Sequence, residues 1–103
     1  MHSRAVLIGF ALGGLLASTS AFAESRPVAL ETCLGCHGIK GYKNAYPTYH
    51  VPKLGGQHAE YIADALRAYA SGSRPHSTMH ANAATLTEDE IQAIAKWFEE
   101  QGR

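Results

Sequence analysis

The sequence Cys33-Leu-Gly-Cys36-His37 contains both cysteines of the chain, three positions apart, with a histidine directly behind the second. Two thiols and an imidazole this close together are typical of a redox-active dithiol, a zinc site, a short disulfide or a covalently attached prosthetic group. Which of these four kinds of site the motif forms constrains the fold, because a small domain usually needs a cofactor, a metal or a disulfide to be stable.

Residues 1–23 have the order of a secretory signal peptide. Arg4 lies before an unbroken apolar run at 5–17, and Ala21-Phe22-Ala23 is a small-x-small cleavage site. The run is shorter than the roughly 20 residues that a membrane-spanning helix needs. We therefore expect cleavage after Ala23, a mature domain at 24–103 in the periplasm, and no stable membrane insertion of that domain.

Charge gives little sign of a nucleic-acid partner. Nine basic residues balance nine acidic ones in the whole chain, and no run of lysine or arginine occurs. Lys40, Lys43 and Lys53 nevertheless make the first part of the mature chain more basic than the last. We expect this basic rim to orient a protein partner during encounter.

The pattern of apolar residues predicts an all-α domain. We expect three helical segments, one opening at Pro27 and reaching Cys33, and two longer ones at about 57–71 and 87–102. Thr87 and Glu90 form a capping box at the start of the last segment. The intervening segments 38–56 and 73–86 are predicted to be irregular loops, since neither shows the alternation of a strand.

The surroundings of the two cysteines favour one kind of site. A thioredoxin-like dithiol is expected in a βαβ context, which this sequence lacks. Zinc needs four ligands, and side chains at the adjacent positions 36 and 37 diverge on a helix. A disulfide across two residues would restrain very little chain. On a helical turn, by contrast, Cys33 and Cys36 project to the same side, where both sulfurs can add to the vinyl groups of haem.

One covalent haem c therefore uses the whole motif, with His37 as the proximal iron ligand. In this respect the chain resembles the class I c-type cytochromes, and most closely the small bacterial single-haem members and the modules of tandem dihaem cytochromes. The likeness covers residues 28–103 and rests on segments 33–38, 52–57, 72–74 and 86–91 together with Met79. It implies three to five helices wrapped around the haem, with the first and last helices crossing.

The resemblance also suggests roles for residues outside the motif. The carbonyl of Pro52 is expected to accept a hydrogen bond from the non-ligating nitrogen of His37, which would orient that ring. Leu54 and Tyr61 are expected to line the haem cavity, and Arg74 to contact a haem propionate.

The sixth iron ligand is predicted to be Met79. It is the only methionine of residues 24–103, and it lies between the last two long helices, where this family supplies its sulfur ligand. His76 and His80 are close by, so ligation by two histidines stays an alternative, as does an open sixth position.

With both axial positions filled, such a haem carries one electron and transforms no substrate itself. The resemblance therefore implies a periplasmic electron carrier between respiratory or dehydrogenase partners. Two alternatives remain. The domain is a haem subunit held permanently on a flavoprotein dehydrogenase, for example one that oxidises sulfur compounds, or it is a sensor or peroxidase with an open sixth site.

Overall fold

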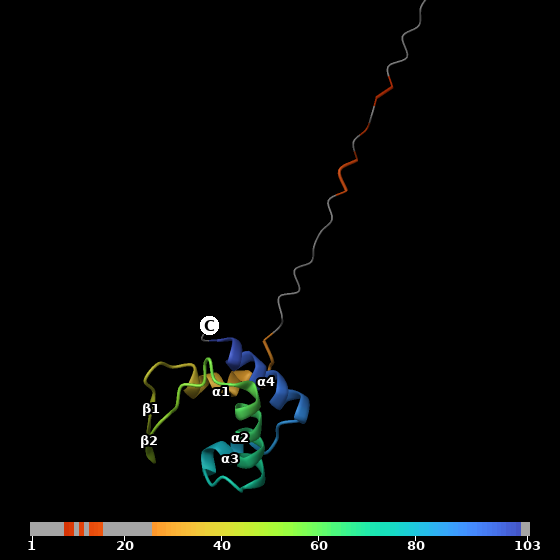
Figure 1. The fold of residues 1–103 in the computed structure, drawn as a ribbon. Helices are drawn as coiled ribbons and strands as arrows, with labels where there is room; N and C mark the ends of the chain where they lie inside the picture. The colour runs from red at the N-terminus through yellow and green to blue at the C-terminus, as the bar shows by residue number, and fades with distance from the viewer. Residues whose placement is uncertain (1–7, 10, 12, 16–25, 102–103) are drawn as a thin grey trace, which may run out of the picture.

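The computed structural model describes residues 8, 9, 11, 13–15 and 26–101. The predicted cleavage position after Ala23 lies outside these residues. The described residues form four helices and two short strands, labelled in Figure 1, in the order α1 (Leu30–His37), β1 (Lys43–Ala45), β2 (Thr48–His50), α2 (Ala59–Ser71), α3 (Ser77–Ala83) and α4 (Glu88–Glu100). No helix in the part of the chain that the structure describes is long and apolar enough to cross a bilayer.

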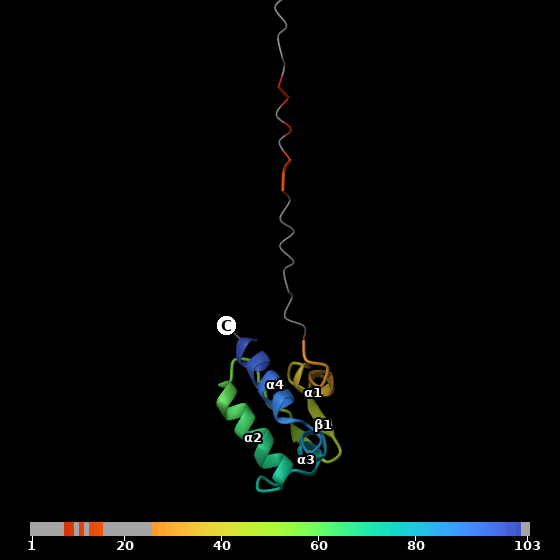
Figure 2. The ribbon, with the colours of Figure 1, turned by 90° about the vertical axis from the view of Figure 1, so that its right-hand side faces the viewer.

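Helices α2 and α4 pack side by side and form the centre of the molecule (Figure 2). Each is amphipathic, with its apolar residues at helical spacing on one face. The capping box of Thr87 and Glu90 is present at the start of α4, and Gly72 ends α2 with a positive φ of 81°. The two long helices therefore form where the sequence predicts them.

The apolar core is small and unevenly shared among the helices. Its buried side chains are Leu30, Ile62, Ala63, Leu66, Ala83, Ile91, Ile94, Ala95 and Phe98. Helices α2 and α4 supply seven of these, whereas α1 supplies only Leu30 and α3 only Ala83. The two short helices thus each contribute a single fully buried side chain to the core, beside partly buried ones.

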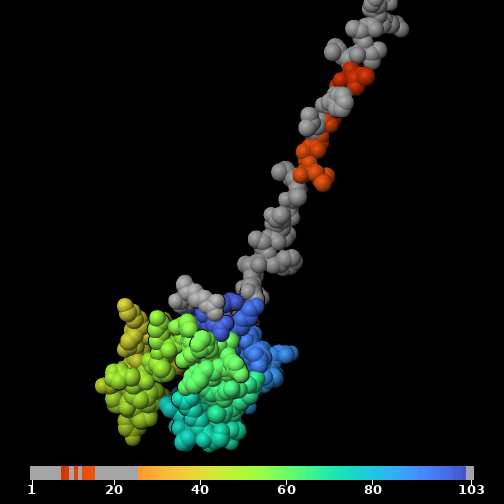
Figure 3. All heavy atoms as spheres, viewed as in Figure 1, coloured from red at the N-terminus to blue at the C-terminus, as the bar shows by residue number. Residues whose placement is uncertain are grey.

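The segment 38–56, predicted to be irregular, contains a β-hairpin. Strands β1 and β2 are antiparallel, with Lys43 opposite His50 and Ala45 opposite Thr48. Each strand has only three residues, too few to show an alternating pattern in the sequence. In the space-filling view the hairpin lies at one edge of the molecule, beside the atoms of α2 and α3 (Figure 3).

The prediction of a loop at 73–86 is also wrong, because α3 lies within it. This helix is polar and buries only Ala83, so it has no apolar repeat to reveal it. Its N-cap residue is His76, whose Nδ1 atom accepts a hydrogen bond from the backbone N–H of Met79 at 3.2 Å. Histidine is not among the usual N-cap residues, so the start of α3 carries no capping signal either.

Candidate haem site

The two thiols and the imidazole of the motif lie on one turn of α1. Cys33, Cys36 and His37 occupy positions i, i+3 and i+4, which share one face of a helix, and all three are half-buried. Neither thiol is in a disulfide. Burial raises the pKa of the Cys33 thiol above its ordinary value, so this sulfur keeps its proton at neutral pH.

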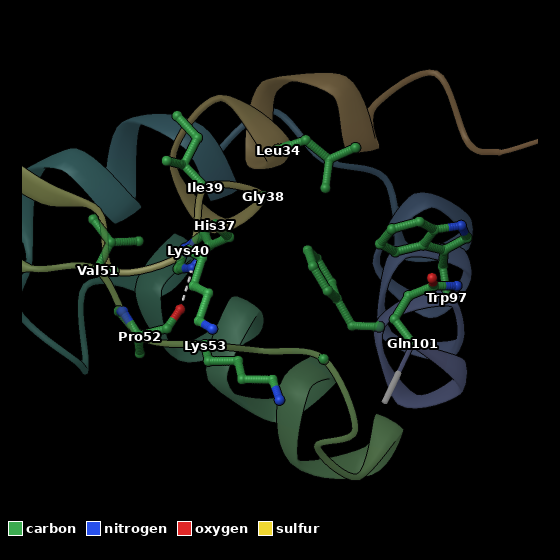
Figure 4. A pocket seen from close by; sticks show the side chains of 13 residues that line it. Leu34, His37, Gly38, Ile39, Lys40, Val51, Pro52, Lys53, Trp97 and Gln101 are labelled. Carbon is green, nitrogen blue, oxygen red and sulfur yellow. Dashed lines mark hydrogen bonds between the residues drawn. The ribbon is translucent and has the colours of Figure 1, made fainter. Parts of the chain in front are cut away.

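The His37 ring is held by the backbone of a distant segment. Its Nδ1–H donates a hydrogen bond of 2.8 Å to the carbonyl of Pro52, drawn as a dashed line in Figure 4. A carbonyl can only accept, so the proton lies on Nδ1 and the Nε2 lone pair is left to bind a metal. The hydrogen bond implied by the family resemblance is therefore present, while the ring's role as an iron ligand stays a prediction.

Helix α4 supports the same ring from another direction. Phe98 is 3% exposed, and its ring meets that of His37 edge-to-face with centroids 6.4 Å apart. The carbonyl of Phe98 accepts a hydrogen bond of 2.9 Å from the backbone N–H of Gly56. This bond joins α4 to the segment that carries Pro52. No sequence pattern predicts this contact between His37 and α4, because the two lie at opposite ends of the domain sequence.

Gly55 lies where the segment after Pro52 comes close to the end of α4. A Cβ atom at Gly55 would lie 2.9 Å from the carbonyl oxygen of Gln101, which is closer than carbon and oxygen normally come. Gly55 thus lets the segment after Pro52 lie against the end of α4.

A cavity of about 590 Å³ opens beside His37. In Figure 4 the side chains of Leu34 and Trp97 line one side of it and those of Lys40 and Lys53 another. No acidic side chain is among the described residues that line the cavity. The lining therefore combines apolar side chains with the positive charges of Lys40 and Lys53.

Met79 lies on α3, which packs against α2 away from α1 (Figures 1 and 2). Its side chain is half-buried and packs against the core. The neighbouring His80 donates a hydrogen bond of 2.9 Å from Nδ1–H to the carbonyl of Tyr69 on α2. The structure thus brings the motif and Pro52 together directly, and supplies Met79 from a separate helix.

The residues expected to line the haem cavity or to contact a propionate do not line the cavity beside His37, and their surroundings differ. Leu54 is half-buried and packs against the core, whereas Tyr61 is 53% exposed. The Arg74 guanidinium donates to the Tyr61 hydroxyl at 3.4 Å and lies 4.8 Å from the centroid of the Tyr69 ring. The hydrogen bond with Tyr61 raises the pKa of Arg74. The haem contacts expected of these residues remain predictions.

A zinc site finds no support in the geometry. Among the residues that the structure describes, no three side chains of histidine, cysteine, aspartate or glutamate gather as metal ligands. The helical turn of two thiols, with an imidazole whose Nε2 is free, instead fits covalent haem.

Comparison with known proteins agrees with this arrangement. Residues 21–98 match the family model described as cytochrome c oxidase, cbb3-type, subunit III. The chain belongs to the class I c-type cytochromes. Its four helices are those of the all-α cytochrome c fold, as predicted, and haem c is the cofactor of the family.

Three relatives of this cytochrome are named as cytochromes or as an electron acceptor. The thiosulfate dehydrogenase electron acceptor of Thiomonas intermedia is 33% identical over 95 residues, which are 92% of this chain and 43% of that protein. The cytochrome subunit of sulfide dehydrogenase from Chlorobaculum tepidum is 36% identical over 93 residues, 87% of this chain and 81% of that protein. Cytochrome c4 of Pseudomonas aeruginosa is 32% identical over 103 residues, 94% of this chain and 50% of that protein. The chain thus spans half or less of two of these relatives.

The burial of the Phe98 ring beside His37 leads to a testable prediction. Phe98→Ala should lower the free energy of unfolding of the haem-loaded cytochrome by roughly 3 to 5 kcal/mol, because it removes a buried ring from a small core. Denaturant unfolding followed by haem absorbance measures this. Ile39→Ala is the control, since Ile39 lines the same cavity but is 52% exposed, and it should cost less than about 0.5 kcal/mol. Equal losses in the two variants would contradict the prediction.

Proposed function

We propose that this cytochrome is an exported one-electron carrier with a single haem c, attached to Cys33 and Cys36 and ligated by His37 and Met79. The observation that carries the proposal is the hydrogen bond from His37 Nδ1–H to the Pro52 carbonyl. It leaves Nε2 of an imidazole on the same turn as two unpaired thiols free to bind iron.

When bound, haem supplies an iron that changes reversibly between the ferrous and ferric states. The residues of the chain hold it and set its properties. The two thiols fix its position through thioether bonds. The Pro52 carbonyl orients the His37 ring and increases the electron donation of Nε2. Phe98 restricts the movement of that ring from the side of α4.

Met79 is the best candidate for the sixth ligand because it offers the only thioether of residues 24–103. The Nδ1 atoms of the competing His76 and His80 are both used in hydrogen bonds within the protein. His80 keeps its Nε2 atom free, so it is the alternative ligand that an experiment must test. Ligation by sulfur raises the reduction potential, which suits a carrier that accepts electrons from a dehydrogenase.

The names of the relatives support a sulfur-compound dehydrogenase as electron donor. One relative is named as the electron acceptor of thiosulfate dehydrogenase and another as the cytochrome subunit of sulfide dehydrogenase. We propose that the chain accepts electrons from an enzyme of this class. Co-purification of this cytochrome with a stoichiometric flavoprotein would instead favour a permanent subunit.

The cavity beside His37 is the proposed docking surface for the acidic face of a redox partner. Lys40 and Lys53 line it, both are exposed, and none of the ion pairs among the described residues involves either lysine. A partner seated here would lie next to the proximal ligand. Electrons would then pass over a short distance.

Covalent attachment is tested by mass and by extraction. The purified protein should have the mass of residues 24–103 plus one haem, and acidified organic solvent should not remove the haem. Cys36→Ala should leave at most one thioether bond and sharply reduce the yield of haem protein. Haem that passes into the solvent from the wild-type protein would contradict covalent attachment.

Sulfur ligation is tested by replacing Met79. Met79→Leu should abolish the weak far-red absorption band of sulfur-ligated ferric haem, lower the reduction potential and allow the reduced protein to bind carbon monoxide. Absorption spectra and a redox titration measure these changes. His80→Ala is the control on the same helix and should leave the band and the potential unchanged. A Met79→Leu protein with both properties intact would refute the assignment.

The docking surface is tested with an anionic redox reagent. Lys40→Glu combined with Lys53→Glu should slow oxidation of the reduced cytochrome by ferricyanide by about tenfold at low ionic strength. The difference should largely disappear at high salt, because ions screen exposed charges. Lys43→Glu is the control, since Lys43 does not line the cavity, and it should have a smaller effect. Stopped-flow absorbance gives the rates; a Lys43→Glu effect as large as that of the double variant would argue against this surface.

A further inference from the structure

His76 is the point at which three elements of the fold meet. It precedes α3, and its ring lies edge-on to Tyr49 of β2, with centroids 5.0 Å apart. The same ring lies edge-on to Tyr69 of α2 at 6.0 Å. The side chain is half-buried. One imidazole therefore links the start of α3 to both the hairpin and α2.

The hydrogen bond of His76 acts directly on the proposed sulfur ligand. Its Nδ1 atom accepts from the backbone N–H of Met79 at 3.2 Å, so in the neutral ring the proton lies on Nε2. This bond satisfies one of the N–H groups that the first turn of a helix leaves without a partner. The hydrogen bond thus holds the backbone of Met79, the proposed ligand.

Helix α3 packs against α2, and His80 adds a hydrogen bond to the carbonyl of Tyr69, but the helix itself is short and mostly exposed. It has seven residues, a length at which an isolated helix is unstable, and only Ala83 is buried. At its far end, Asn82 donates only to the carbonyl of Thr78 within the same helix. The hydrogen bond from Met79 N–H to His76 is therefore one of a small number of polar contacts that position Met79, beside its packing on the core.

Tyr69 gives His76 a fixed support. The carbonyl of Tyr69 accepts the hydrogen bond from His80, and Arg74 lies 4.8 Å from the centroid of its ring. Tyr69 belongs to α2, which is packed on α4 in the core. His76 thus packs against the helix pair that supplies most of the buried side chains.

We propose that His76 is a positioning residue for Met79, which it holds through the Nδ1 hydrogen bond so that the methionine sulfur stays on the iron. The inference rests on the proposed ligation by Met79. Without the hydrogen bond, the first turn of α3 is freer to move, and the sulfur leaves the iron for a larger fraction of the time. An external ligand then binds more tightly, because its apparent affinity is proportional to the fraction of protein with an open site.

The experiment measures imidazole binding to the ferric haem protein, together with the far-red band of sulfur ligation. His76→Phe keeps a ring between the two tyrosines but removes the acceptor. It should bind imidazole about fivefold more tightly than the wild type, the factor that corresponds to an N-cap worth about 1 kcal/mol. His76→Asn restores an acceptor at the N-cap and should stay within about twofold of the wild type. Should His76→Phe not fold, His76→Ala replaces it in the same comparison.

His58→Ala is the matched control. His58 also stands at a helix N-cap, that of α2, but it is exposed and its side chain makes no capping hydrogen bond. This variant should keep the imidazole affinity and the far-red band of the wild type. Circular dichroism establishes that each variant is folded at the temperature of the measurement.

The outcomes separate this inference from the assignment on which it rests. A wild-type protein without the far-red band overturns ligation by Met79 and the role of His76 together. A wild-type protein with the band whose folded His76→Phe variant binds imidazole no more tightly overturns the role of His76 alone. Equal tightening in His76→Phe and His76→Asn also overturns it, because the acceptor would then not be what matters.

Discussion

The packing of α4 on α2 is the contact on which the other parts of the molecule depend. These two helices supply seven of the nine buried side chains. Every segment that carries a candidate haem residue is attached to this pair. Phe98 of α4 meets the ring of His37 and bonds to Gly56 beside the Pro52 segment, and Tyr69 of α2 supports the start of α3. The two long helices thus position the segments of the candidate haem site through a small number of specific contacts.

The two histidines that matter most are fixed in opposite ways. His37 donates from Nδ1 to a carbonyl, which leaves Nε2 available to a metal. His76 accepts at Nδ1 from a backbone N–H, so its proton lies on Nε2 and that atom is less suited to bind iron. The group that hydrogen-bonds to Nδ1 therefore determines which ring nitrogen carries the proton in each histidine, and with it whether Nε2 is free to bind a metal.

The parts of this fold that the sequence predicts are those with local signals. Helix α4 has a capping box and an apolar face, and α2 ends at a glycine, so both could be located in advance. The hairpin and α3 could not, because three-residue strands and a polar seven-residue helix have no pattern of their own. Pro52 was found only through family resemblance. The contacts of Phe98 and His76 with distant segments depend on how the chain folds, which no local pattern encodes.

The small share of the core held by α1 has a consequence for the order in which this protein is completed. We expect a helix with one buried side chain to open at a lower free-energy cost than the pair α2 and α4, so that α1 can open while that pair stays packed. If haem is attached at Cys33 and Cys36, as proposed, both thiols would be accessible for the reaction while the long helices are already together. Closure of α1 around Leu30 would then be the last step of assembly, and the bound haem would make it permanent.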